Sequence, residues 1–533
     1  MARVLVVEAV AQAGIDVLTA THDTDVRLNL PRAELLQLLA EGGGYDALVV
    51  RSQTRVDAEV LRAGAPRLSV VGVASIGTDK IDVEAATRAG VMVVNAPTGN
   101  TIAAAEHTMA LMLGLLRQVP AADASVRAGD WERGSFTGSE LRGKALGIIG
   151  LGKIGKQVCR RALAFEMTVL AFDPYITAEQ ASEVGARLVG FPELLQRADV
   201  VSVHAPLTTQ TRGLLATPQL EAMKRGVFCL NVARGGIYDE AALARALASG
   251  HVAGAAIDVF ATEPMAADNP LRGAPHTIFT PHLGASTREA QARVGHEMAE
   301  QVVMALDGVT PPYAVNAPAV QPDIAPKLRP YVELARRLAL LARQVSQQPI
   351  GEIGLTYAGE VSAWDGAPMR TAALAGLLEA ITDQRVNAVN ADLVARERGL
   401  RVSETRTEAS EPWASLLTVE VAPGADGGTA LRLSGSTAHG RPHLVSMNGF
   451  EIGAELTGTI LITHHHDRPG VVGAVGTLLA EAGVNISSLE LSRLSAAGEA
   501  MMFVSIDDGV PAAALERLRA HDAIVDARFV ELP

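Results

Sequence analysis

Cysteines are scarce in this sequence, which argues against a fold held together by disulfides. Only two, Cys159 and Cys229, occur among 533 residues, and both stand in apparent helix or strand segments. A disulfide framework or a cysteine-based metal site needs more of them at defined spacings. We therefore expect both to be small buried hydrophobic residues.

Blocks of basic residues are also missing. The chain carries 46 Lys and Arg against 59 Asp and Glu, a formal net charge of −13, and the basic residues are spread along it. Nucleic acids and anionic membranes bind to clustered Lys and Arg. Neither is therefore an expected partner.

Long apolar runs are missing too. No stretch approaches the roughly 18 uncharged apolar residues of a membrane-spanning helix. Near the N-terminus the apolar run is interrupted by Glu8, and the long apolar core of a secretory signal is not found. We expect a soluble, cytoplasmic protein.

What is present is a chain of globular composition in which strand-like and helix-like segments alternate. With 533 residues, 48% of them hydrophobic and 20% charged, three or four domains are expected. Short apolar runs alternate with helical patterns over residues 1–97, and the same rhythm continues from residue 147 to about residue 282. Such alternation is typical of parallel sheets covered by helices.

The stretch from Gly147 to Pro174 reads as strand, glycine turn, helix and second strand, the order of a dinucleotide-binding unit. Gly150 would permit the tight turn, Gly152 would let the backbone approach a pyrophosphate, and Gly155 would let the helix pack on the strand. The helix N-terminus would hold the phosphates. Asp173, 18 residues after Gly155 (173 − 155), is placed to accept hydrogen bonds from a ribose diol. Because its carboxylate would repel a 2′-phosphate, NAD is favoured over NADP.

Three further residues stand at the ends of predicted strands and supply what hydride transfer from an alcohol needs. Arg234 lies in a glycine-flanked turn, Glu263 directly precedes a proline, and His282 follows a strand. A base must accept the hydroxyl proton, a carboxylate can orient that base, and a cation must bind the neighbouring carboxylate. Each residue alone has an ordinary alternative, namely a solvated arginine, a turn glutamate or a capping histidine. Their joint occurrence after a dinucleotide motif favours the catalytic interpretation.

Together these motifs resemble those of the D-2-hydroxyacid dehydrogenase family, and the resemblance extends to about residue 315. It implies that His282 is the acid/base, that Glu263 is its carboxylate partner, and that Arg234 binds the substrate carboxylate and polarises the carbonyl. It implies that His204, near the nicotinamide ribose, is structural. The implied NAD-binding residues are Gly150, Gly152, Lys153, Ile154, Gly155, Asp173, Ala233, Arg234, Asp258, His282 and Gly284.

The resemblance also implies an α/β fold of several domains. A Rossmann-type doubly wound nucleotide domain, residues 98–285, would be inserted in a flavodoxin-like substrate domain made of residues 1–97 and 286–316. Closure of the cleft between these two domains would exclude water from the hydride transfer. An α+β intervening domain, residues 317–456, would precede a last domain, residues 457–533.

The substrate is expected to carry a second anionic group. The segments around Arg51 and Arg133 are similar to phosphate-contacting segments of the phosphoglycerate dehydrogenases, a branch of this family, and Lys144 is a third candidate. Guanidinium groups bind phosphate through paired hydrogen bonds. Residues 74–77 fit the loop whose amides meet the substrate carboxylate, although Ser75 and Lys80 stand where Gly and Asn are frequent. The implied substrate-binding residues are Arg51, Ser75, Ile76, Gly77, Asn100 and Arg133.

From residue 458 onward the pattern of strand, helix, strand, strand, helix and strand predicts a ferredoxin-like βαββαβ unit. The longest phosphoglycerate dehydrogenases carry an intervening domain and then an ACT domain that binds serine. The resemblance implies that His465, Asp467 and Asn485 hold this effector at a paired interface. The run His464–His466 could instead suggest a metal site, but without a nearby cysteine or a clear fourth ligand we prefer a polar strand end and expect no metal.

The resemblance thus implies the NAD-dependent oxidation of 3-phospho-D-glycerate to 3-phosphooxypyruvate, the first step towards serine, by a homotetramer that L-serine inhibits. A glyoxylate or hydroxypyruvate reductase is the alternative within the family, but such enzymes usually end near Val315, which leaves 218 residues (533 − 315) unexplained. A formate dehydrogenase would place Gln at the position of Glu263. An NAD-sensing protein without turnover is the alternative from another class, and the complete set of Arg234, Glu263 and His282 argues against it.

Overall fold

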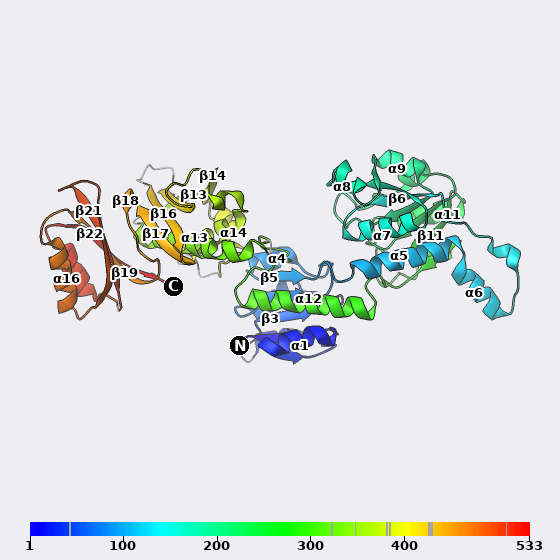
Figure 1. Cartoon of the computed structure of the whole chain (residues 1–533). Coiled ribbons are helices and arrows are strands. Elements are labelled where there is room, and N and C mark those ends of the chain that lie inside the picture. Colours follow the sequence, from blue (N-terminus) through cyan, green and yellow to red (C-terminus); the bar gives the residue numbers. More distant parts are fainter. Residues whose placement is uncertain are drawn as a thin grey trace.

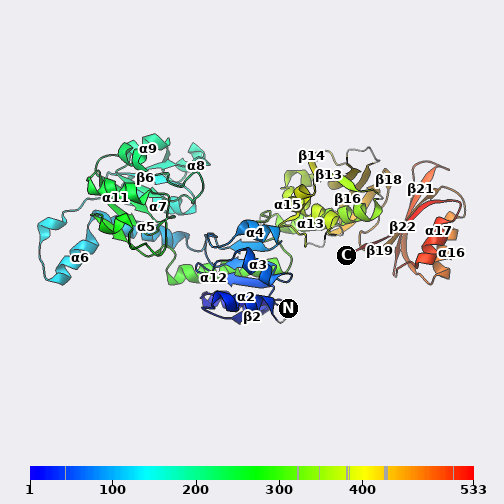
Figure 2. The same ribbon diagram turned by 180° about the vertical axis from the view of Figure 1, so that it is seen from behind.

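Four β-sheets follow one another along the chain in the computed structural model, which describes residues 1–41, 44–320, 323–346, 348–379, 382, 385–424, 430–507 and 509–533. Figures 1 and 2 show them as successive bodies, with the first sheet in the middle, the second at one end, and the third and fourth towards the other end. Within the described ranges no helix is both long and apolar enough to cross a membrane. The expected α/β architecture is confirmed.

The first sheet has five parallel strands in the flavodoxin-like order β2-β1-β3-β4-β5. Helices α1 and α12 cover one face, and α2, α3 and α4 cover the other (Figures 1 and 2). Strand β3 is buried along its whole length, which explains its continuous apolar sequence. The elements are β1 (Arg3–Val6), α1 (Gln12–Thr21), β2 (Asp23–Val26), α2 (Arg32–Ala40), β3 (Ala47–Val50), α3 (Ala58–Gly64), β4 (Val70–Val73), α4 (Val83–Arg88), β5 (Met92–Asn95) and, from later in the chain, α12 (Arg288–Leu306).

The chain leaves the first sheet through residues 98–100, which are held by α12. Thr98 Oγ1 donates a hydrogen bond to Glu297 Oε1 at 2.6 Å, and the Gly99 amide donates to Glu297 Oε2 at 3.0 Å. Asn100 then stands at the N-cap of α5, and Thr101 is the first helical residue. One glutamate of α12 therefore fixes the crossing between two sheets.

The second sheet has seven parallel strands in the order β12-β11-β10-β9-β6-β7-β8, with α5 and α7 on one face and α9, α10 and α11 on the other. This is the Rossmann arrangement, and its switch point lies between β6 and β9, where open α/β sheets bind ligands beyond the strand ends. The elements are α5 (Thr101–Leu116), α6 (Val119–Ala128), η1 (Arg133–Phe136), β6 (Ala145–Ile149), α7 (Lys153–Ala164), β7 (Thr168–Phe172), α8 (Ala178–Ser182), β8 (Arg187–Leu188), α9 (Phe191–Arg197), β9 (Val200–Val203), α10 (Thr217–Ala222), β10 (Val227–Asn231), α11 (Glu240–Ala248), β11 (Val252–Ile257), η2 (Pro270–Gly273) and β12 (Thr277–Phe279).

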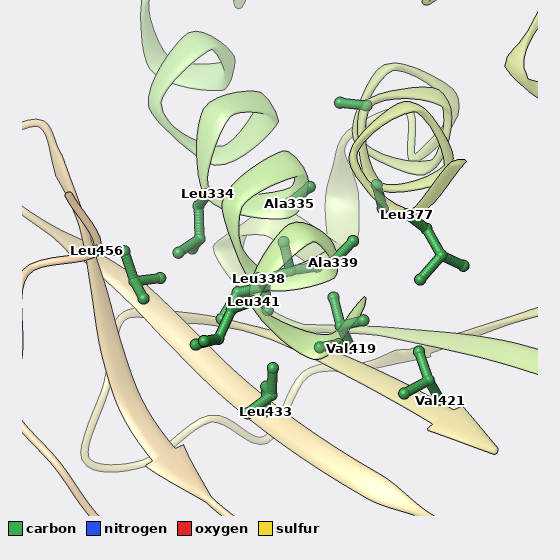
Figure 3. Packing of buried hydrophobic residues seen from close by; sticks show 14 of the residues in the cluster. Leu334, Ala335, Leu338, Ala339, Leu341, Leu377, Val419, Val421, Leu433 and Leu456 are labelled. Carbon is green, nitrogen blue, oxygen red and sulfur yellow. The ribbon is translucent and has the colours of Figure 1, made fainter. Parts of the chain in front are cut away.

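The third sheet has six strands in the order β14-β13-β15-β16-β17-β18; β13 and β14 run parallel, and the other neighbours run antiparallel. Leu338 and Leu341 of α13 lie over Val419 and Leu433 of the strands, so helix and sheet share one apolar core (Figure 3). The elements are α13 (Ala325–Val345), β13 (Ile350–Gly359), η3 (Glu360–Ala363), α14 (Ala367–Leu378), α15 (Ala391–Glu397), β14 (Arg401–Thr407), β15 (Ser415–Pro423), β16 (Leu431–Ala438), β17 (Arg441–Met447) and β18 (Phe450–Glu451).

The fourth sheet has four antiparallel strands in the order β20-β21-β19-β22, which confirms the ferredoxin-like arrangement. Helices α16 and α17 cover one face. The other face, through Ile460, Ile462 and Phe503, belongs to the same apolar core as α13. The last two sheets therefore share one apolar core that includes α13. The elements are β19 (Gly458–His466), α16 (Val471–Glu481), β20 (Ile486–Arg493), β21 (Glu499–Ile506), α17 (Ala512–Arg519) and β22 (Ile524–Leu532).

Candidate active site

The glycine turn after β6 has the geometry that a dinucleotide phosphate requires. Gly150 has a φ of +93°, a conformation that residues with a side chain rarely adopt. A Cβ on Gly155 would lie 2.3 Å from the Gly150 carbonyl oxygen, whereas among the described residues nothing lies within 4 Å of a Cβ placed on Gly152. Lys153 and Ile154 begin α7. The turn is thus packed tightly at Gly155 and open at Gly152, which fits a phosphate at the start of α7.

Asp173 stands directly after β7, beside this turn. Its Oδ2 accepts a hydrogen bond from the Leu151 amide at 2.9 Å, and its Oδ1 accepts one from the Tyr175 amide at 3.0 Å. Two backbone amides therefore fix the carboxylate at the turn. Since each carboxylate oxygen has a second lone pair, a ribose diol could still bind there.

His282 and Glu263 form a hydrogen-bonded pair. His282 Nδ1 lies 2.8 Å from Glu263 Oε2, and the Phe260 amide donates to Glu263 Oε1 at 3.0 Å. The hydrogen bond to Glu263 raises the pKa of His282, and burial opposes this effect. Burial works against ionisation of Glu263, but the hydrogen bonds from His282 and Phe260 lower its pKa below the usual value. The carboxylate therefore orients the imidazole and stabilises its protonated form.

A buried network holds the loop that carries His282. The Asp258 side chain is fully buried and accepts hydrogen bonds from the amides of Leu283 at 2.7 Å and Gly284 at 3.0 Å. His107 Nε2 lies 3.2 Å from Asp258 Oδ1. Burial works against ionisation of Asp258, but hydrogen bonding to His107 helps to lower its pKa. The network keeps His282 at a φ of +57°, a left-handed conformation that is uncommon for a residue with a side chain.

Arg234 connects the second sheet to a loop of the first. Its Nε lies 3.3 Å from Asp79 Oδ2, and its Nη1 donates to the Ala233 carbonyl at 2.8 Å. A Cβ on Gly77 would lie 2.3 Å from Arg234 Nη2, so only a glycine lets the guanidinium come so close to the loop backbone. The structure thus places Arg234 against one of the residues expected to bind substrate.

The loop itself is held by side chains. Asn95 Nδ2 donates a hydrogen bond to the Ile76 carbonyl at 2.6 Å, and Ser75 Oγ donates to the Gly77 carbonyl at 2.7 Å. With two carbonyls occupied in this way, the loop has a fixed shape beside Arg234. A fixed backbone next to a guanidinium can bind a small carboxylate.

Arg51 and Asn100, two more of the expected substrate-binding residues, stand at the ends of elements. Arg51 follows β3 directly, and its guanidinium makes no hydrogen bond or ion pair with the residues that the structure describes. Asn100 Oδ1 is buried and lacks a hydrogen-bond partner in the described parts of the chain. Both side chains therefore retain unused binding capacity.

Arg133 and Lys144 lie elsewhere. Helix α6 projects from the second sheet and contains no buried residue (Figures 1 and 2). Arg133 follows it along the chain, and its guanidinium carbon lies 6.0 Å from the centre of the Trp131 ring. No contact between Arg133 and His282 occurs in the described residues. Lys144 directly precedes β6, at the amino end of the parallel sheet, whereas the glycine turn follows β6 at the carboxyl end.

The other expected structural residues behave as such. His204 Nε2 lies 2.9 Å from Ser202 Oγ, and burial lowers the pKa of His204 to about 4, so this imidazole is neutral near pH 7. Cys159 and Cys229 are buried and unpaired, as expected from their sequence context.

The three expected effector residues do not meet within one chain. Asp467 follows the last residue of β19 and lies 3.1 Å from Arg493, whereas Asn485 precedes β20 and donates to Asp507 at the other end of the sheet. The length of β19 separates them, roughly 25 Å at about 3.3 Å per residue. The His465 side chain is only 2% exposed, so its ring is not available to a ligand in this structure. Across the described ranges, no group of three His, Cys, Asp or Glu side chains is arranged to hold a metal.

Three residues that contact the site region were not assigned a role from the sequence. Asp79 pairs with Arg234, His107 contacts Asp258, and Glu8 binds the backbone that follows Arg51. The available signal was a charged or titratable residue inside an apolar pattern, as at Glu8 and His107. Such a signal does not reveal the partner.

Comparison with known proteins covers both halves of the chain. Residues 109–284 match the family described as D-isomer specific 2-hydroxyacid dehydrogenase, NAD binding domain. Residues 327–448 match the D-3-phosphoglycerate dehydrogenase intervening domain, and residues 459–523 match the ACT domain.

Similar proteins of known name span the whole length. The chain is 40% identical to a D-3-phosphoglycerate dehydrogenase of Archaeoglobus fulgidus over 99% of its own residues and 100% of that protein. It is 39% identical to one of Bacillus subtilis over 100% of both chains. Among solved structures, a glyoxylate reductase from Paecilomyes thermophila has a TM-score of 0.55 and 31% identity, covering 59% of this chain and 98% of that one.

The matches to the intervening and ACT domains, together with identity near 40% from end to end, identify the relationship. The chain therefore belongs to the D-3-phosphoglycerate dehydrogenase family, within the D-isomer specific 2-hydroxyacid dehydrogenases.

Proposed function

We propose that this protein oxidises 3-phospho-D-glycerate to 3-phosphooxypyruvate with NAD as the hydride acceptor. The observation that carries the proposal is the whole-chain match to relatives named D-3-phosphoglycerate dehydrogenase. The glyoxylate reductase structure covers only 59% of the chain. A reductase of that kind therefore leaves the intervening and ACT regions without a counterpart.

The proton-transfer part of the reaction falls to His282. With Nδ1 held by Glu263, its Nε2 accepts the proton of the substrate hydroxyl, and the carboxylate stabilises the imidazolium that forms. The glycine turn and Asp173 would hold NAD, whose nicotinamide would supply the hydride acceptor for the carbon that bears this hydroxyl. In the reverse direction His282 returns the proton to the carbonyl oxygen.

Arg234 and the loop of the first sheet bind the substrate carboxylate in this proposal. The guanidinium offers two parallel N–H donors to a carboxylate, and it lies close to the Gly77 backbone. Asp79 holds the guanidinium at 3.3 Å until the substrate arrives. Because Arg234 belongs to the second sheet and Gly77 to the first, substrate binding favours closure of the two domains.

The phosphate is proposed to bind Arg51 and Arg133. Arg51 has an unpaired guanidinium within the described residues, whereas Arg133 belongs to the projecting arm of residues 119–140. Val119, Val126 and Trp131 of this arm are 55%, 54% and 72% exposed, which supports contact of the arm with another copy of the chain. We therefore assign Arg133 to the phosphate site of a partner subunit in a homotetramer.

L-serine is the proposed inhibitor. Since Asp467 and Asn485 stand at opposite ends of one ACT sheet, a site that uses both residues requires two paired ACT domains. Serine would then act by favouring one arrangement of the domains. A cytoplasmic location is part of the same proposal and is supported by the two unpaired cysteines.

The test is a comparison of initial rates of NAD reduction with 3-phosphoglycerate, D-glycerate and D-lactate, with and without serine. We expect the highest kcat/KM with 3-phosphoglycerate and a lower rate when serine is added. A higher kcat/KM for an unphosphorylated acid, or NAD binding without turnover, would contradict the proposed reaction. An unchanged rate, together with no binding of serine, would refute the regulatory part alone.

A further inference from the structure

Glu8 is a buried carboxylate to which the proposed mechanism gives no role. It lies just beyond the end of β1 and is 8% exposed. Its oxygens accept hydrogen bonds from three consecutive backbone amides, those of Ser52 at 2.9 Å, Gln53 at 3.1 Å and Thr54 at 2.8 Å. These amides belong to the turn that begins at Arg51, directly after β3.

The contacts of Glu8 are those of an ionised carboxylate that fixes the shape of a turn. Burial works against ionisation, but the amide hydrogen bonds lower the pKa of Glu8 below the usual value. No Lys, Arg or His pairs with Glu8 in the described parts of the chain. A buried charge is tolerated when hydrogen bonds satisfy it, and here all of them come from one turn.

The base of the same turn is fixed by the sheet. The Val7 amide donates to the Val49 carbonyl at 3.1 Å, and the Ala74 amide donates to the Val50 carbonyl at 2.8 Å. Arg51 therefore sits between a fixed strand end and a turn tied to Glu8. Its backbone has little freedom, while its guanidinium has no partner among the described residues.

We propose that Glu8 is a positioning residue for phosphate recognition: by binding the amides of residues 52–54 it holds Arg51 where its guanidinium can meet the substrate phosphate. This inference rests on the proposed function. The carboxylate also occupies the three amides, which could otherwise bind an anion themselves. The phosphate is thereby left to the guanidinium, whose paired donors match its geometry.

Glu8→Ala and Glu8→Gln change the acceptors of the three amides in different ways. Alanine removes the acceptor of all three amides of the turn. Glutamine keeps the volume but replaces one accepting oxygen by an NH2 group that would face an amide N–H. In both variants the turn should relax, and small displacements of binding groups cost on the order of ten- to a hundredfold.

The experiment measures KM and kcat for the reduction of 3-phosphooxypyruvate and of hydroxypyruvate, its unphosphorylated counterpart, with the full chain. For Glu8→Ala we expect KM for the phosphorylated substrate to rise roughly tenfold or more, with kcat and the hydroxypyruvate KM within about twofold of wild type. Glu8→Gln should show a smaller rise. Glu59→Ala is the matched control, because it removes an exposed carboxylate on α3 of the same domain, paired with Arg32.

A double-mutant cycle separates positioning from a general loss of structure. If Glu8 acts through Arg51, then Glu8→Ala should add little to the KM of an Arg51→Ala variant. Additive effects, or equal losses with both substrates, would overturn the inference. Should Glu8→Ala fail to fold, the same comparison is made with Glu8→Gln, for which a wild-type KM contradicts the inference. A wild-type enzyme that does not use the phosphorylated substrate would refute the proposed function instead.

Discussion

Replacing Glu263 by glutamine separates the charge of the carboxylate from its shape. In the structure Glu263 Oε1 accepts the Phe260 amide at 3.0 Å, and Oε2 accepts from His282 at 2.8 Å. A glutamine has one accepting oxygen for these two donors. If it keeps the Phe260 amide, its NH2 group faces His282 Nδ1, and the neutral ring then carries its proton on Nε2. That tautomer cannot accept the substrate proton.

The expected fall in kcat follows from the strength of the hydrogen bond between His282 and Glu263. Bonds to charged groups contribute about 1.5–3 kcal/mol. His282 and Glu263 are 48% and 38% exposed, so solvent screening places this pair near the lower end of that range. A loss of about 1.5 kcal/mol corresponds to a fall in kcat of roughly tenfold, and the unfavourable tautomer can only increase it.

The pH profile of the Glu263→Gln variant should shift in a defined direction. Hydroxy acid oxidation needs neutral His282, so the rate rises as pH increases through the pKa of this residue. Glu263 raises that pKa, whereas burial lowers it. Without the carboxylate the rising limb should move to lower pH. In the reductive direction, which needs protonated His282, activity should be lost at lower pH than in wild type.

The assay is a pH profile of kcat for NAD reduction and for NADH oxidation. Glu193→Gln, which removes an exposed carboxylate paired with Arg197 on α9, serves as the control. If the rising limb of the pH profile lies at the same pH as in wild type and kcat stays within twofold, then Glu263 does not set the protonation of His282.

Four further substitutions test other parts of the account. Asp173→Ala should narrow the preference for NAD over NADP, measured as the ratio of kcat/KM, because the carboxylate beside Leu151 no longer repels a 2′-phosphate; an unchanged ratio would remove Asp173 from the ribose site. Arg133→Ala should raise KM for 3-phosphoglycerate by roughly tenfold, the value of one charge-assisted contact, and an unaltered KM would exclude Arg133 from phosphate binding. Asp467→Ala and Asn485→Ala should each raise the serine concentration that gives half-inhibition, and an inhibition curve identical to wild type would place the effector elsewhere.

The arrangement of the first two sheets could be predicted because it follows from local pattern. Apolar runs that alternate with helices predict parallel sheets, and the residues that end those strands meet at one edge. Glu263 and His282 follow separate strands but are hydrogen-bonded for this reason. The glycine turn and Asp173 were predictable for the same reason, since β6 and β7 are neighbours.

What could not be predicted depends on contacts between distant segments. Glu8 lies more than 40 residues from the amides that it binds, and the pairing of Arg234 with Asp79 joins two domains. Neither contact produces a periodic pattern in the sequence. The packing of the ACT sheet on α13 was equally unpredictable. Ile460 would be apolar whether it faced a helix of its own domain or a neighbouring core.

Arg133 shows a limit of another kind. Its neighbourhood in the sequence suggested a phosphate contact, but a chain considered alone places it beside Trp131 on an arm without buried residues. A sequence pattern identifies the residue type, but it carries no information about contacts between copies of the chain. The same holds for Asp467 and Asn485, which a single ACT sheet keeps apart.

The most direct test of the central claim is the rate of NADH formation from 3-phosphoglycerate by His282→Ala, with NAD affinity measured on the same preparation. Removal of a general base costs about 10²–10⁴-fold, whereas the glycine turn and Asp173 that are proposed to hold NAD are untouched. We expect turnover to fall by that factor and NAD affinity to stay within about twofold of wild type. Turnover at the wild-type rate would contradict the assignment of His282 as the base and, with it, the proposed mechanism.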